Sequence, residues 1–185
     1  MHIQTAKRKR ILKSKRARTH LPFGAQRFLA ILEGLEGGFA IGASVIVGLS
    51  FANLDRRVLL VSAAIGIMVN GFNNAAVKYS SEHYEDELDG RESHSPFKKY
   101  FVPAFLEFLA YFAISLFALI PLALIPNIYL AMATCCVVTL IMLFAAGYWR
   151  GYLMHLHPWR DGREMMLLGA GIILVGILTG YILHL

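Results

Sequence analysis

Long apolar segments alternate with short polar ones along the chain after residue 27. About 20 consecutive apolar residues cross a bilayer as a helix, and five segments reach that length. They cover approximately residues 28–52, 58–79, 103–124, 128–149 and 165–184. Apolar residues make up 57% of the 185 residues, too many for an ordinary soluble domain of this size. The pattern predicts an all-α membrane protein in which residues 28–185 form one domain of five transmembrane helices.

The first apolar segment combines acidic and small residues in the stretch EGLEGGFAIGASVIVGLS. Glu33 and Glu36 are three residues apart, so they are expected to share a face of the helix. An acid inside a membrane helix costs roughly 2.5–3.5 kcal/mol and normally faces protein or a water-filled path. Gly34, Gly38 and Gly42 recur every four residues and form a groove that a second helix can approach closely. We expect this groove to hold the second copy of the helix in a homodimer.

The second segment becomes polar towards its end, where Asn70, Asn73, Asn74 and Lys78 lie at helical spacing on one side. These side chains are expected to face another helix or an aqueous cavity, because lipid cannot solvate them. The acidic run that follows should continue the helix beyond the membrane. Its members, which could attract cations or form a solvated helix end, are Glu82, His83, Glu85, Asp86 and Glu87.

The basic residues cluster ahead of the first segment. Eight of the 18 Lys and Arg residues lie in the stretch 7–18, within a basic arm that covers residues 1–27. Such an arm orients a membrane protein and attracts anionic lipid headgroups. Nucleic-acid binding is the weaker alternative, because no aromatic residues are interleaved with the charges. With a cytoplasmic N-terminus, 16 basic residues lie on the cytoplasmic side against two outside, so the C-terminus is expected outside.

Other classes of site have little support in the sequence. Cys135 and Cys136 are adjacent within an apolar run, and we expect them to be small buried residues without a disulfide. The sequence contains no Gly-rich phosphate loop, and no nucleophile–base set stands out. We therefore expect a membrane protein that is not an enzyme and that needs no cofactor.

Several motifs occur in an order that suggests a family. They are Glu36-Gly37, the run LVSAAIGIMVNG at 60–71, SEHYEDEL at 81–88, Pro103, Pro121-Leu122, Trp149-Arg150-Gly151, His157-Pro158 and Gly169-Ala170. With these motifs, the chain resembles the vacuolar iron transporter family. The resemblance implies a five-helix protomer that dimerises and moves Fe2+ or Mn2+ out of the cytosol in exchange for protons, along the first two helices. Separately, the sequence shows no signal or transit peptide, and we expect an integral protein of a prokaryotic plasma membrane.

The chain departs from the family pattern at positions that carry metal chemistry. This chain has Asn74 where the family has a methionine ligand, and Lys78 where the family has a glutamate. It has Gly66 where the family has another acidic residue. The larger cytosolic metal-binding insert of some members is expected to be absent. The resemblance is therefore expected to extend to the fold more fully than to the metal ligands.

These observations predict a set of site residues. The candidate metal ligands are Glu33, Glu36, Asn70, Asn74, Glu82 and Glu85, and the candidate gating or charge partners are Lys78 and Glu107. Lys78 can extend to the membrane interface and leave Glu36 free for a metal ion or a proton. Alternatively, Lys78 points inward and pairs with Glu36. In that case the chain is a membrane protein that keeps the fold and has lost transport.

Overall fold

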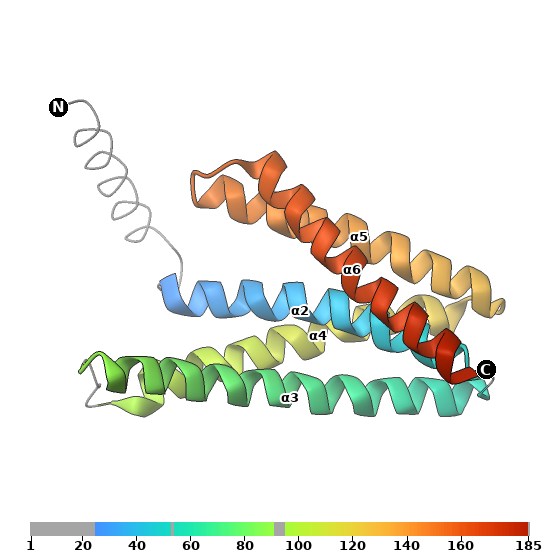
Figure 1. Ribbon diagram of the computed structural model, residues 1–185, viewed down its shortest axis with the longest axis horizontal. Helices are drawn as coiled ribbons and strands as arrows, with labels where there is room; N and C mark the ends of the chain where they lie inside the picture. The colour runs from blue at the N-terminus through green and yellow to red at the C-terminus, as the bar shows by residue number, and fades with distance from the viewer. Residues whose placement is uncertain (1–24, 53, 91–94, 185) are drawn as a thin grey trace.

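The computed structural model describes residues 25–52, 54–90 and 95–184 (Figure 1). The described elements are α2 (Ala25–Ser50), α3 (Arg56–Leu88), the π-helical turn η1 (Phe97–Phe101), α4 (Val102–Leu124), α5 (Ile128–Leu153) and α6 (Pro158–His184). Within these described residues, five helices are long and apolar enough to cross a membrane, which confirms the predicted all-α membrane fold. Residues 1–24, which hold most of the basic arm, lie outside the described residues.

Helix α2 occupies the centre of the bundle. It lies between the pair formed by α3 and α4 and the pair formed by α5 and α6, and it contacts all four helices (Figure 1). The large apolar side chains that are exposed in the described part of the chain belong to the other helices and their connections, not to α2. The small residues of α2 allow four neighbours to approach it closely. The apolar outer surface of the remaining helices is suited to a lipid bilayer.

The glycine groove of α2 is filled by α4 of the same chain. A Cβ atom on Gly34 would lie 3.0 Å from the backbone nitrogen of Tyr111, and one on Gly42 would lie 3.3 Å from the Cβ of Ser115. The Ser115 hydroxyl donates a 2.9 Å hydrogen bond to the carbonyl oxygen of Gly38. The prediction that Gly34, Gly38 and Gly42 line a contact between two copies of this helix is therefore wrong, because α4 already occupies the groove.

A second close contact joins α2 to α6. A Cβ atom on Gly48 would lie 3.1 Å from the carbonyl oxygen of Gly176. One turn earlier along α2, the Ser44 hydroxyl donates a 3.0 Å hydrogen bond to the carbonyl oxygen of Ile172. Small and hydroxyl-bearing residues thus hold α2 on two sides, as is typical of helices that pack within a membrane.

Two helix boundaries bear on the sequence predictions. Helix α3 continues to Leu88, which confirms that the acidic run extends the second helix. Residues 150–164, which separate the fourth and fifth predicted segments, are mostly helical, since α5 ends at Leu153 and α6 begins at Pro158, where proline is tolerated in a first turn. The turn between them closes through His155, whose φ is 53°, and through a 2.9 Å hydrogen bond from the Leu156 N–H to the Gly151 carbonyl.

Arg56 joins the start of α3 to the turn between α4 and α5, at the other end of α5 from the α5–α6 turn. Its Nη2 donates hydrogen bonds to the carbonyl oxygens of Ile125 and Pro126, at 2.7 Å and 2.6 Å. These oxygens follow the last turn of α4, where carbonyl groups have no helical partner. The neighbouring Arg57 is exposed.

We expect Arg56→Gln to lower the free energy of unfolding by about 1.5 kcal/mol, the lower end of the range for hydrogen bonds to a charged group. The matched variant Arg57→Gln, which removes the same charge at an exposed position, should change stability little. Thermal unfolding of both variants in detergent, followed by circular dichroism, measures the difference. Equal melting temperatures would contradict this assignment.

Candidate functional site

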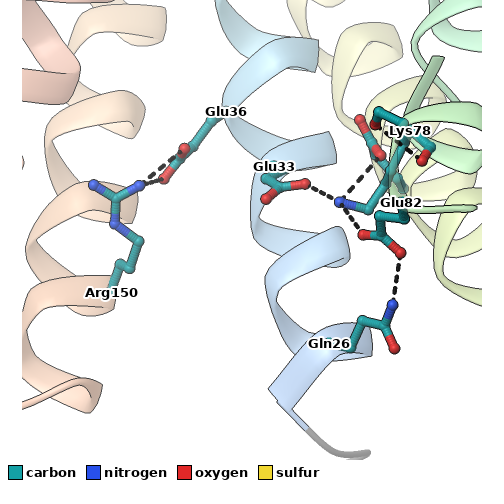
Figure 2. A network of polar contacts seen from close by, with 8 residues as sticks. Gln26, Glu33, Glu36, Lys78, Glu82 and Arg150 are labelled. Atoms are coloured by element: carbon teal, nitrogen blue, oxygen red, sulfur yellow. Dashed lines mark hydrogen bonds and ion pairs between the residues drawn. The ribbon is translucent and has the colours of Figure 1, made fainter. Parts of the chain in front are cut away.

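Charged side chains from α2, α3 and α4 gather around the ammonium group of Lys78 (Figure 2). The ammonium pairs with Glu33 of α2, and it lies 3.3 Å from Glu82 Oε1 and 3.8 Å from Glu107 Oε2. Gln26 donates a 2.6 Å hydrogen bond to the other oxygen of Glu82. The Lys78 side chain is only 12% exposed, so it does not extend into solvent. Of the two alternatives for Lys78, the side chain therefore takes the inward position rather than the extended one.

Glu36 belongs to a separate pair with Arg150 of α5. The Arg150 Nη1 lies 3.1 Å and 3.3 Å from the two carboxylate oxygens of Glu36, whose side chain is 13% exposed. Figure 2 shows Glu33 and Glu36 directed to opposite sides of α2. Residues three apart differ by about 60° around a helix of 3.6 residues per turn, and long side chains can widen that difference. The expected common face of the two acids is therefore wrong, and so is the alternative in which an inward Lys78 pairs with Glu36.

Among the three acidic side chains around the Lys78 ammonium, that of Glu107 is the most deeply buried. It is 9% exposed, and its Oε2 has no hydrogen-bond partner among the described residues. The distance of 3.8 Å to Lys78 is too long for a hydrogen bond. Leaving a buried acceptor without a hydrogen bond carries a free-energy cost, because the group has lost its water. Glu107 therefore retains an unused capacity to bind a cation or a donor.

The asparagines of α3 lie in different environments. Asn70 donates a 2.8 Å hydrogen bond to the hydroxyl of Tyr111, a side chain that is 1% exposed. The Tyr111 ring fits between Gly71 of α3 and Gly37 of α2. Asn74 is half-buried on the side of α3 that approaches Gly37, whereas Asn73 is exposed. Asn70, Asn74 and Lys78 therefore face neighbouring helices as predicted, whereas Asn73 does not.

The acidic end of α3 is held against η1. The Tyr100 hydroxyl donates a 2.9 Å hydrogen bond to Asp86, which also forms a 2.5 Å ion pair with Lys99. Tyr100 is fully buried, and the His83 ring lies 5.0 Å from the Tyr100 ring. Glu85 is exposed and is not among the partners of Lys78. This end of the helix is therefore partly a packing surface and partly solvated.

The predicted ligands do not form a metal centre as they stand. Within residues 25–52, 54–90 and 95–184, no three His, Cys, Asp or Glu side chains are grouped so that they could hold a metal ion. Glu33 and Glu82 instead contact Lys78, and Glu36 contacts Arg150. Two important residues were not among the predicted site residues: Arg150, which was noted only within a motif, and Tyr111.

Comparison with known families adds one finding. A protein-family model described as the VIT family matches residues 81–181 of the chain. The matched region covers more than half of the 185 residues and extends from the acidic end of α3 into α6. Helix α2 and the part of α3 that carries Lys78 precede the matched region. A search of curated proteins found no match.

Proposed function

Because the chain belongs to the VIT family, we propose that it is a transporter that moves a divalent metal ion, Fe2+ or Mn2+, out of the cytosol in exchange for protons. VIT family proteins are transporters and not enzymes. The five apolar helices make the chain an integral membrane protein. We take it to be a short member of the family without the larger cytosolic insert.

One observation supports metal transport above the others: carboxylates from three helices converge on a single cation, the ammonium of Lys78. Carboxylate oxygens are suitable ligands for Mn2+, and they occur in many iron sites. Acidic residues inside a membrane protein are costly and usually mark an ion or proton path. The Lys78 cluster, defined here as Glu33, Lys78, Glu82 and Glu107, is therefore the part of this path that we propose the ion visits.

The proposed orientation places the Lys78 cluster towards the cytosol. The support is the excess of Lys and Arg on that side, which sets the orientation of membrane proteins. On this view the basic arm at residues 1–27 binds anionic lipids of a prokaryotic plasma membrane. We also propose a homodimer, in which the contact involves surfaces other than the glycine groove that α4 fills.

A second candidate function has its own support. Both acids of α2 are already paired with basic side chains, Glu33 with Lys78 and Glu36 with Arg150. A chain with such pairs could keep the family fold and no longer transport metal. Measurement of ion flux separates the two candidates directly.

We expect purified protein in proteoliposomes to take up Mn2+ or Fe2+ under a pH gradient. Glu33→Gln and Glu107→Gln should each reduce this flux by about tenfold or more, since each removes a proposed cation ligand. Glu164→Gln, at an exposed position of α6, provides the control for loss of one acid. Absence of flux in the parent protein, with folding intact, would favour the non-transporting alternative.

A further inference from the structure

We infer that Lys78 is a built-in competitor for divalent cations. Its ammonium occupies the place that a divalent metal ion would take among Glu33, Glu82 and Glu107, and the ion binds there only when the ammonium leaves. The inference rests on the proposed function in taking a divalent metal as the ligand. It adds a control element to that function, because the protein then carries its own occupant of the site.

The geometry of the cluster resembles that of an occupied cation site. The three carboxylates come from α2, α3 and α4, and they approach the ammonium from different helices. Exposure of their side chains falls from 50% at Glu33 through 24% at Glu82 to 11% at Glu107. The cluster thus has an open end at α2 and a buried end at α4, so an ion has a side from which to enter.

The charge balance and the hydrogen bonding both favour a divalent ion over the ammonium. One ammonium among three carboxylates leaves two negative charges unbalanced. Glu107 Oε2 is buried and has no hydrogen-bond partner among the described residues, although it lies 3.8 Å from the ammonium. Because the ammonium is attached to the backbone of α3, it contacts Glu33 and Glu82 more closely than Glu107. A free ion has no such restriction and could contact all three.

The same arrangement explains why no metal centre is assembled among the residues that the structure describes. While Lys78 is inside the cluster, its ammonium repels a second cation and keeps the carboxylates around itself. The long and flexible lysine side chain allows the ammonium to withdraw towards the polar end of α3. Withdrawal would leave three acidic side chains and no positive charge at the centre.

Mn2+ binding to the purified full chain tests the inference. Electron paramagnetic resonance of free Mn2+ should show that Lys78→Met binds the ion about tenfold or more tightly than the parent, because one competing positive charge is gone. Adding Glu107→Gln to Lys78→Met should reverse the gain. The matched variant Lys99→Met, which removes a lysine paired with Asp86, should leave the affinity unchanged.

Equal Mn2+ affinity in folded Lys78→Met and parent protein would overturn the inference, as would an equal gain in Lys99→Met. A second measurement needs no variant. In the parent protein, Mn2+ should raise the rate at which an acylating reagent modifies Lys78 relative to the exposed Lys98. An unchanged ratio at saturating Mn2+ would also overturn the inference.

The outcomes remain distinct from those of the transport assay. Tighter Mn2+ binding by Lys78→Met without flux in any form of the protein would uphold the built-in competitor and reject transport. Flux in the parent, combined with unchanged Mn2+ affinity in Lys78→Met, would reject the competitor and leave transport in place.

Discussion

Replacing Gly38 with leucine is expected to lower the free energy of unfolding by about 3 kcal/mol, because it separates α2 from α4. A Cβ atom at this position would lie 2.6 Å from the carbonyl oxygen of Tyr111 and would also collide with the side chain of Ile114. A backbone oxygen cannot rotate away, so one helix must shift. The shift would also break the hydrogen bond from Ser115 to the Gly38 carbonyl, which is worth about 1 kcal/mol.

Gly171→Leu is the matched control, since a Cβ atom on Gly171 of α6 would meet nothing within 4 Å. Thermal unfolding in detergent should show a large decrease for Gly38→Leu and little change for Gly171→Leu. Cross-linking or light scattering should be recorded on the same samples. A Gly38→Leu protein that keeps its melting temperature but loses its dimer would show that the groove joins two copies of the chain and would contradict the assignment to α4.

Arg150→Gln is expected to destabilise the protein by about 3 kcal/mol, the lower end of the cost of leaving one member of a buried pair alone. The Glu36 carboxylate is 13% exposed and has Arg150 on its two oxygens, so the change leaves an uncompensated charge between α2 and α5. The double variant Glu36→Gln with Arg150→Gln should recover most of the loss, because two neutral amides replace the charges.

A double-mutant cycle in denaturant or heat measures this coupling. The cycle compares the parent, the two single variants and the double variant under one set of conditions. Additive losses in the double variant would mean that Glu36 and Arg150 act independently. The pair would then have no role in joining α2 to α5.

The fold was largely predictable because transmembrane helices depend on local composition. Each apolar run is long enough to be recognised without knowledge of its neighbours, and the acidic run at 81–88 continues the helical pattern. The segment 150–164 was less predictable. Its polar residues fall outside the predicted apolar segments, yet the Gly151 carbonyl and His155 close α5 within a short turn, and Pro158 begins α6 soon afterwards.

The site was predictable as a set of residues but not as a set of pairs. Glu33, Glu36, Lys78 and Glu107 stand out because lipid cannot solvate charge. Their partners depend on how helices distant in sequence are packed, and Glu36 and Arg150 are 114 positions apart. The glycine pattern likewise shows that α2 permits a close approach, without showing which helix makes it. Small residues carry no information about the identity of their neighbour.

The acids at the polar end of α3 and the buried acid beside Lys78 are expected to respond differently to ionic strength, because α3 extends beyond the membrane. At 1.5 Å per residue, its 33 residues extend roughly 50 Å, whereas the hydrocarbon core is about 30 Å thick. The exposed Glu85 and Glu87 lie at the polar end, where dissolved salt screens charges over about 8 Å. Within the Lys78 cluster, Glu107 is buried and is largely shielded from these ions, whereas half of the Glu33 side chain is exposed. Added salt should therefore weaken the attraction of cations by Glu85 and Glu87 and leave the interaction of Lys78 with Glu107 nearly unaffected.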